Sequence, residues 1–250
     1  MKDEDFIAAE DRARLRANGL DDFDAVWQLR LEAVDTPNTE RGGWSSVFRL
    51  ELDGAAYYLK RQSNHLTRSL AHPFGEPTFA REFRNIRRYR ELGIPALQAA
   101  FFGMRRIPGE QRAILLTRAL DDWRDLDSWL STWPTLDAER RVAILHACGG
   151  LAKRLHEAGQ VHGCFYPKHI FLREHDGAFD ACLIDLEKTR PVLFGQRDRV
   201  KDLEPLVRRS NAWSEADVRE FLTAYLPDRQ AVEGWSQRLS KRQRQKEARR

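Results

Sequence analysis

Alternating hydrophobic and polar residues around a tight-turn dipeptide constrain the fold of this chain most strongly. Between Val47 and Asp53, hydrophobic residues occupy every second position, so one face of an extended strand would be apolar. Asp53-Gly54 follows, and Asp-Gly is a preferred central pair of two-residue hairpin turns. Ala55 to Lys60 then reads as a returning strand. We therefore predict an antiparallel β-hairpin in the first third of the chain.

After this hairpin, helix patterns dominate. Helices are predicted over Asp3–Asn18, Phe79–Leu92, Leu126–Leu130, Leu136–Ala158 and Val200–Tyr225, with short strands at Ala113–Thr117, Ile170–Arg173 and Ala181–Ile184. A β-rich beginning followed by a mainly helical remainder indicates an α+β fold of two lobes. The expected domains are an N-terminal helical extension (1–24), an N-lobe (25–117), a C-lobe (118–240) and a basic tail (241–250).

Composition and cysteine usage indicate a protein of the cytoplasm. The chain has 250 residues and is 42% hydrophobic, enough for a core, and its net charge is only +4. The three cysteines form no C-x-x-C pair, which fits a reducing compartment better than a disulfide framework. The charged N-terminus does not resemble a signal peptide. We also expect no transmembrane helix, because no stretch approaches the ~20 apolar residues that one needs.

Four features occur in an order that suits phosphoryl transfer. Lys60 ends a strand, Glu82 lies on the next helix, His162 and His169 bracket a loop, and Asp185 follows an apolar strand. Phosphoryl transfer needs a Lys for the nucleotide phosphates, a Glu that holds this Lys, a catalytic loop, and a carboxylate for Mg²⁺. Each feature alone is weak evidence. Their order predicts a protein-kinase-like bilobal fold that binds ATP and Mg²⁺.

Three segments give a more specific resemblance. They are Glu40-Arg41-Gly42-Gly43-Trp44-Ser45 with Tyr58-Leu59-Lys60-Arg61-Gln62, then Phe79 to Pro95, then His156 to Asp185. Together they resemble the lipopolysaccharide core heptose kinase and InaA-type family over roughly Thr36 to Leu206. The resemblance implies a protein-kinase-like fold and transfer of the ATP γ-phosphate to a sugar hydroxyl of the lipopolysaccharide inner core.

The resemblance also implies a role for each matching residue. Lys60 would pair with the phosphates, with Glu82 as its partner. His162 would open the catalytic loop as a structural residue. His169 falls where most protein kinases have a metal-binding Asn, and the heptose kinases place His there too, so His169 and Asp185 would hold the metal. Asp202 resembles the Asp that opens the next large helix and bonds back to the catalytic loop.

Two positions depart from the usual kinase pattern. Cys164 stands two residues after His162, where kinases have the Asp that takes or orients the acceptor proton. Either another group substitutes, with His169 and Glu187 as candidates, or the protein is a pseudokinase, a nucleotide-binding or scaffold module. The phosphate loop has only Gly42 and Gly43 instead of three spaced glycines, although its backbone N–H groups could still approach phosphates.

Other classes of function fit less well. The interval from Asp185 to Asp202 is short for the activation segment of a protein Ser/Thr kinase and has no Ala-Pro-Glu signature. The positive charge is dispersed or confined to the tail, which argues against a nucleic-acid partner. The expected partner is the lipopolysaccharide core acceptor. Peripheral contact with the anionic inner membrane, at its cytoplasmic face, is expected through the tail from Lys241 to Arg250.

Overall fold

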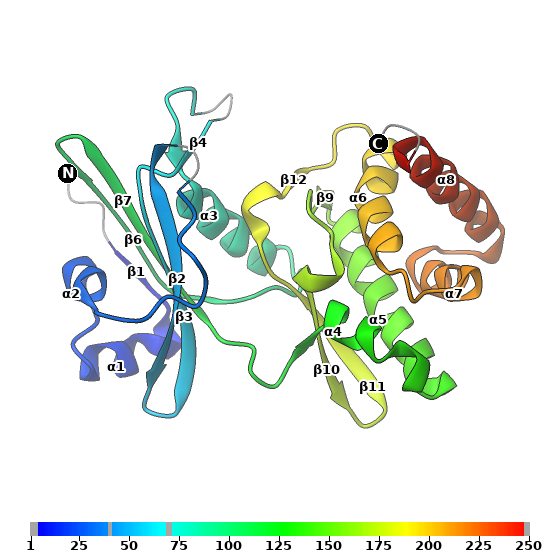
Figure 1. The fold of residues 1–250 in the computed structure, drawn as a ribbon, viewed down its shortest axis with the longest axis horizontal. Helices are drawn as coiled ribbons and strands as arrows, with labels where there is room; N and C mark the ends of the chain where they lie inside the picture. The colour runs from blue at the N-terminus through cyan, green and yellow to red at the C-terminus, as the bar shows by residue number, and fades with distance from the viewer. Residues whose placement is uncertain (1–4, 40–41, 69–71, 248–250) are drawn as a thin grey trace. The chain divides into compact units, whose positions relative to one another are not determined.

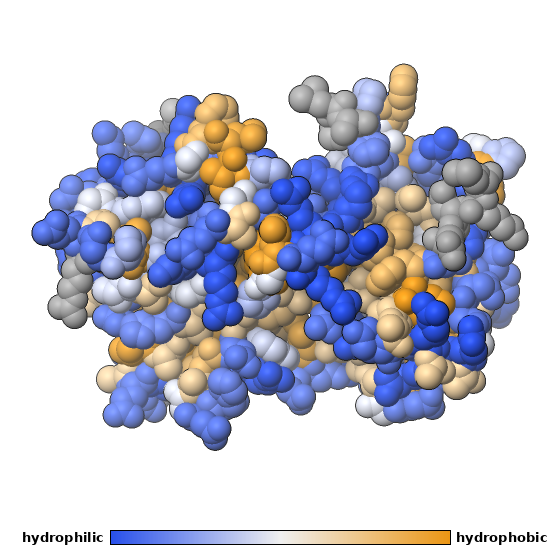
Figure 2. Space-filling model, turned by 180° about the vertical axis from the view of Figure 1, so that it is seen from behind, coloured by the Kyte–Doolittle hydropathy of each residue, from blue (hydrophilic) through white to orange (hydrophobic). Residues whose placement is uncertain are grey.

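The computed structural model describes residues 5–39, 42–68 and 72–247. The chain forms two compact units, one of Met1–Arg88 with Leu97–Asp121 and the other of Tyr89–Ala96 with Asp122–Arg250. The ribbon in Figure 1 shows the β-rich first unit and the mainly helical second unit. Within the described residues, no helix has both the length and the apolar character that a membrane span requires. Hydrophilic side chains cover most of the face shown in Figure 2.

A five-stranded antiparallel sheet forms the centre of the first unit, in the order β1-β6-β7-β3-β2. Its strands are β1 (Phe6–Ile7), β2 (Trp44–Leu52), β3 (Ala55–Ser63), β6 (Ala99–Ile107) and β7 (Glu110–Arg118). The predicted hairpin is confirmed, because β2 and β3 pair from Leu52 and Ala55 outward. Asp53 and Gly54 both have positive φ angles, 46° and 74°, as a type I′ turn requires.

Helices cover both faces of this sheet. Helices α1 (Ala9–Ala17) and α2 (Phe23–Gln28) lie on one face, and α3 (Thr78–Glu91), whose first part belongs to this unit, lies on the other (Figure 1). The core between α1, α2 and the sheet includes Leu15, Phe23, Val26, Phe48, Tyr57, Leu59, Phe101 and Ile114. The N-terminal extension therefore contributes to the core of the first unit. Two short strands, β4 (Leu66–Thr67) and β5 (Glu76–Pro77), precede α3.

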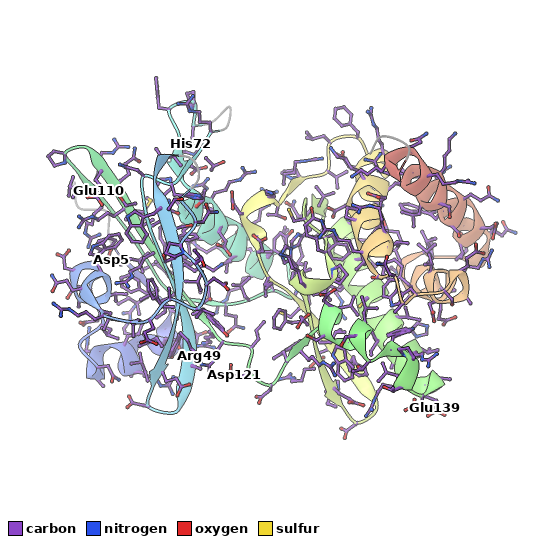
Figure 3. All side chains as sticks on the ribbon, viewed as in Figure 1. Asp5, Arg49, His72, Glu110, Asp121 and Glu139 are labelled. Atoms are coloured by element: carbon purple, nitrogen blue, oxygen red, sulfur yellow. The ribbon has the colours of Figure 1, made fainter. Side chains whose placement is uncertain are left out.

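Two secondary-structure predictions for this unit were wrong in their extent. Strand β1, paired with β6, lies within the predicted helix Asp3–Asn18, and α1 begins only at Ala9; residues 1–4 are outside the described part. The predicted strand Ala113–Thr117 lies within the longer strand β7, which forms a hairpin with β6. Two ion pairs lie near the surface of this unit. Asp5 accepts hydrogen bonds from Arg105 at 2.7 and 2.8 Å. Both carboxylate oxygens of Asp121 accept hydrogen bonds from Arg49 at 2.7 Å (Figure 3).

Helices build most of the second unit. They are α4 (Leu126–Ser131), α5 (Ala138–Glu157), α6 (Gln196–Arg209), α7 (Glu215–Tyr225) and α8 (Arg229–Glu247). The predicted helix from Leu136 to Ala158 is confirmed as α5, which begins after the cap Asp137 and ends before Gly159. Its residues Ile144, Leu151 and Leu155 are buried. The segment predicted to be helical from Val200 to Tyr225 contains two helices, because α6 ends at Arg209 and Ser214 begins α7 with a capping box.

Short strands position the loops of the second unit. Strands β8 (Arg124–Asp125), β10 (Ile170–His175) and β11 (Ala178–Leu183) form one antiparallel sheet, and β9 (Gln160–Val161) pairs with β12 (Arg190–Pro191). Helix α8 continues into the predicted basic tail, as far as Glu247. Lys246 makes an ion pair with Glu204 at 3.4 Å. Residues 248–250 are outside the described part.

Candidate functional site

Lys60 and Glu82 form an ion pair in the first unit. Lys60 lies on β3, between Val47 of β2 and Leu115 of β7. Its Nζ donates to Glu82 Oε1 at 2.7 Å. The Glu82 side chain is only 3% exposed, whereas that of Lys60 is 19% exposed. The carboxylate of Glu82 is therefore buried. Its hydrogen bond holds the Lys60 ammonium in place, and the Lys60 side chain remains partly exposed.

A buried amide fixes the helix that carries Glu82. Gln62 is fully buried, and its Oε1 accepts from the Phe79 backbone N–H at 2.8 Å and the Thr78 hydroxyl at 2.7 Å. Its Nε2 donates to the His65 carbonyl at 2.6 Å. These bonds tie the end of β3 to the first turn of α3. This role of Gln62 was not predicted; its position two residues after Lys60, on the same side of the strand, was the available signal in the sequence.

Gly42 and Gly43 lie at the start of β2. A Cβ atom on Gly43 would stand 2.2 Å from the Ser63 carbonyl oxygen, so only glycine allows this close approach to the end of β3. Gly42 has a φ of +74°, and a Cβ there would meet nothing within 4 Å. The structure thus gives Gly43 a packing role. Contact of this loop with phosphates stays a prediction.

His162 links the catalytic loop to the segment that carries Asp185. The side chain is fully buried, and its Nε2 lies 2.9 Å from the Ile184 carbonyl oxygen. Because a carbonyl only accepts, Nε2 carries the proton, and Nδ1 accepts from the Cys164 N–H at 3.3 Å. Burial lowers the pKa of His162, so the ring is neutral near pH 7. These contacts fit the structural role expected for it.

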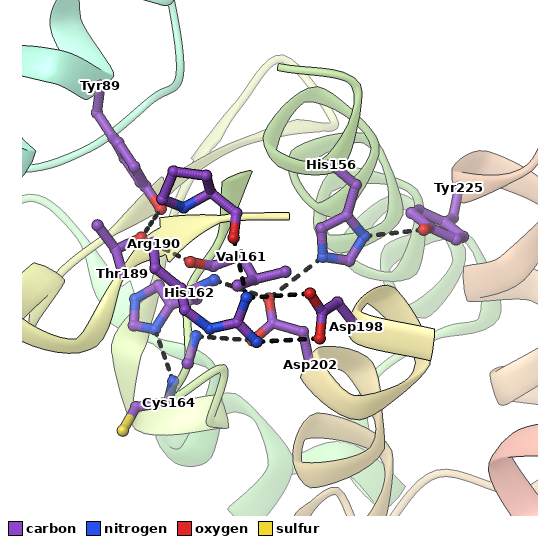
Figure 4. A network of polar contacts seen from close by, with 12 residues as sticks. Tyr89, His156, Val161, His162, Cys164, Thr189, Arg190, Asp198, Asp202 and Tyr225 are labelled. Atoms are coloured by element: carbon purple, nitrogen blue, oxygen red, sulfur yellow. Dashed lines mark hydrogen bonds and ion pairs between the residues drawn. The ribbon is translucent and has the colours of Figure 1, made fainter. Parts of the chain in front are cut away.

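Asp202 holds the backbone of the same loop (Figure 4). Its carboxylate accepts from the N–H groups of His162 at 2.8 Å and Gly163 at 2.7 Å, and it contacts His156 Nε2 at 3.2 Å. The Nδ1 atom of His156 in turn lies 2.8 Å from the Tyr225 hydroxyl. The bond back to the catalytic loop is confirmed. Asp202 lies inside α6, however, and does not open the helix.

A second buried carboxylate orders the loop before α6. Asp198 accepts from both terminal nitrogens of Arg190 at 3.0 Å and from the N–H groups of Leu193 at 2.8 Å and Phe194 at 3.1 Å. The bonds from Arg190 hold the pKa of Asp198 well below its usual range. The sequence analysis missed this clamp. It presents Leu193 and Phe194 to solvent, 68% and 66% exposed.

His169 and Asp185 come together at the expected metal site. His169 Nδ1 lies 2.8 Å from the Cys164 carbonyl oxygen, so this nitrogen carries a proton and donates. Nε2 lies 3.3 Å from Asp185 Oδ2. Burial lowers the pKa of His169, and the neutral ring therefore turns an Nε2 lone pair towards a carboxylate. Asp185 has a left-handed backbone, with φ 59° and ψ 63°.

Two electron-pair donors that face each other repel unless a cation lies between them. The 3.3 Å separation of Nε2 and Oδ2 is close to the roughly 3 Å between neighbouring ligands of an octahedral cation with bonds of about 2.1 Å. The pair therefore fits a divalent metal, although Mg²⁺ prefers oxygen to imidazole. Among the described residues, no group of three or more His, Cys, Asp or Glu side chains could hold a metal. Phosphate oxygens and water would supply the remaining ligands.

Cys164 occupies the position of the usual catalytic Asp. It is 5% exposed, and burial raises the pKa of its thiol, while the charge of Lys188 acts in the opposite direction. The thiol is therefore neutral near pH 7 and cannot accept a proton. Lys188, which the sequence analysis did not consider, has a raised pKa, chiefly through Cys164, and stays protonated. A Cβ on Gly163 would lie 2.6 Å from the Lys188 carbonyl, so glycine allows this contact.

Known proteins share the family and the fold of this chain. Residues 24–225 match the model of the lipopolysaccharide kinase (Kdo/WaaP) family. The chain is 34% identical over 208 residues to protein InaA of Escherichia coli (strain K12). This match covers 82% of this chain and 95% of InaA. It is also similar to the solved structure of WaaP in complex with acyl carrier protein, with a TM-score of 0.69 and 23% identity over 96% of this chain and 99% of that one. The protein-kinase-like α+β fold is confirmed, and the chain belongs to the lipopolysaccharide kinase (Kdo/WaaP) family.

Proposed function

We propose that this protein is an ATP-dependent kinase that transfers the γ-phosphate to a sugar hydroxyl of the lipopolysaccharide inner core. The observation that carries the proposal is the 2.7 Å bond from Lys60 to a buried Glu82. This pair is the element that active protein kinases need to place the nucleotide phosphates. The family model supplies the class of acceptor.

Each of these site residues would have a definite task. Lys60 would donate to the phosphates, and Glu82 would keep its ammonium in place. Asp185 and His169 would hold Mg²⁺, which neutralises phosphate charge and orients the transferred group when bound. His162 and Asp202 would keep the loop backbone rigid through the bonds described above.

The proton of the acceptor hydroxyl needs another route than Cys164. The neutral thiol cannot take it, and Lys188 is already protonated. His169 has its Nδ1 committed to the Cys164 carbonyl and its Nε2 turned to Asp185, so it is a poor base as well. Phosphoryl transfer depends mainly on positioning and charge neutralisation. We therefore propose a slow kinase in which the proton leaves late, without a dedicated base.

Peripheral contact with an anionic membrane at the cytoplasmic face is part of this proposal. Asp198 accepts hydrogen bonds from the backbone N–H groups of the exposed pair Leu193 and Phe194. Arg197 and Lys201 on α6 are exposed close by in the sequence. Apolar side chains flanked by cations suit the surface of an anionic bilayer. Lys246 of the tail is engaged by Glu204. The three cysteines are free thiols, in keeping with a reducing compartment.

A transfer assay tests the proposed function. The full-length protein is incubated with Mg-ATP and dephosphorylated core oligosaccharide, and the oligosaccharide is examined by mass spectrometry. We expect the gain of one phosphate, with none for Asp185→Ala. ATP binding by calorimetry without transfer, in the wild type and in Cys164→Asp alike, would instead support a pseudokinase. Failure to bind Mg-ATP at all would overturn both readings.

A further inference from the structure

A pocket of about 480 Å³ lies in the second unit, beside the loop that contains Cys164 and His169. Residues 166–168, which separate these two positions, line one part of it. Arg208 and Arg209, the last two residues of α6, and Asn211 after this helix line another part, and Asp127 of α4 also contributes. The backbone of Tyr166 is bonded to Cys164 and His169 at 2.8 and 2.9 Å. A ligand in this pocket would therefore lie next to the catalytic loop.

Two of the lining cations have no carboxylate partner in residues 5–39, 42–68 and 72–247. These are Lys168 and Arg209, which appear in no ion pair, whereas Arg208 is neutralised by Glu204 at 2.7 Å. The Arg209 guanidinium lies 4.0 Å from the centre of the Tyr166 ring, and this cation–π contact fixes its place over the loop. Lys168 is exposed. The pocket therefore offers two oriented, unneutralised cations to a ligand.

The other lining groups suit sugar hydroxyls. Asp127 can accept from hydroxyl groups, and Asn211 can both donate and accept. A guanidinium and an ammonium recognise carboxylate or phosphate oxygens through charge-assisted hydrogen bonds. Both kinds of group together match a sugar with an anionic substituent better than a neutral sugar or an inorganic anion.

We propose that this pocket binds an anionic sugar residue of the acceptor, one that bears a carboxylate or a phosphate and neighbours the sugar whose hydroxyl is phosphorylated. The inference rests on the proposed function, because the pocket is read as part of the acceptor site. It adds a specificity determinant to that function. Lys168 and Arg209 select acceptors by their charge, and this selection does not depend on bound nucleotide.

The test measures binding without ATP, so that it does not depend on turnover. Glucuronic acid, glucose 6-phosphate and glucose are titrated separately into the full chain, and binding is followed by ligand-observed NMR. We expect one or both anionic sugars to bind at least about fivefold more tightly than glucose, as one charge-assisted contact at an open site allows. Which of them binds distinguishes a carboxylate from a phosphate. The double variant Lys168→Gln/Arg209→Gln should abolish the difference.

Arg106→Gln is the matched control. Arg106 is exposed and lines a pocket of about 400 Å³ in the first unit, which also contains several arginines. It should leave the preference for anionic sugars intact. Equal binding of glucose and the anionic sugars, or a preference that survives the double variant, would overturn the proposal. An unchanged thermal midpoint of the double variant would show that it is folded. If the anionic preference is found but no phosphate is ever transferred, the proposed function fails and the binding site remains.

Discussion

The two units keep different parts of the kinase machinery. In the first unit, Lys60 and Glu82 form the ion pair that the kinase pattern requires, at 2.7 Å and with the carboxylate buried. In the second unit, His162 and Asp202 keep the loop backbone in place, but Cys164 replaces the acidic side chain that this backbone normally presents. The first unit therefore has the ion pair that the proposed chemistry needs, while the second has the supporting hydrogen bonds without the acidic side chain.

This difference separates two requirements of phosphoryl transfer. Placing and neutralising the phosphates needs fixed charges, and these are present as Lys60 and, with His169, Asp185. Taking the acceptor proton needs a group with a suitable pKa, and the raised pKa of Cys164 excludes it. Enzymes can lose the second contribution and keep much of the first. The comparison thus predicts a kinase that depends strongly on its charged residues and weakly on position 164.

The largest effect is expected from the charged residues. Lys60→Met and Asp185→Asn should each lower turnover by about 10²–10³-fold, because the first removes the cation proposed to contact the phosphates and the second removes the carboxylate proposed to hold Mg²⁺. Both should also weaken Mg-ATP binding in calorimetry. Lys153→Met, which removes a lysine from α5, is the control and should behave as wild type. Unchanged ATP affinity in both site variants would show that neither Lys60 nor Asp185 takes part in nucleotide binding.

Position 164 should respond in the opposite direction. Cys164→Ala should keep turnover within about twofold of wild type, whereas Cys164→Asp should raise it at least about tenfold, because a positioned base typically contributes 10²–10⁴-fold. Steady-state phosphotransfer measures both. Cys148→Ala, at a buried thiol of α5, controls for general loss of packing. If Cys164→Ala alone abolishes turnover, the thiol takes part in the reaction and the proposed late proton transfer is wrong.

The contrast also marks what the sequence could reveal. Lys60, Asp185 and the β2–β3 hairpin follow from local patterns, and Cys164 from counting two residues after His162. Gln62, Lys188 and the Arg190–Asp198 clamp were missed, because their roles arise from contacts that only the folded chain creates. Strand β6 was not predicted, because its Ala-rich start and its Arg-rich end show little alternation of hydrophobic and polar residues. The sequence pattern predicted that Gly43 contacts phosphates. Its packing against Ser63 could not be predicted, because no local sequence pattern indicates it.

A smaller effect should distinguish the exposed apolar residues of the two units. Leu193→Ser/Phe194→Ser in the second unit should weaken binding to anionic vesicles by about fivefold, because two partly inserted side chains are lost. Phe74→Ser is the matched control in the first unit, where Phe74 is 92% exposed without the Asp198 clamp. Vesicle co-sedimentation measures all three proteins. Equal losses for both variants would point to general hydrophobic adsorption, and no loss for either would remove the proposed membrane contact.

The smallest effect is a pH dependence of stability that originates in the second unit. Burial lowers the pKa of His162 in the folded protein from the ordinary value near 6.5. As the pH falls below about 6.5, the unfolded chain binds a proton that the folded ring resists, so the free energy of unfolding decreases. The slope from this residue cannot exceed about 1.4 kcal/mol per pH unit. Urea titrations between pH 7.5 and 5 should show this decrease.

In His162→Gln, whose amide can still donate to the Ile184 carbonyl, stability at pH 7.5 should be lower but its pH dependence flatter. A slope that is the same in both proteins would mean that other groups cause it, and His169, whose pKa is lowered by the same burial, would be the next residue to replace.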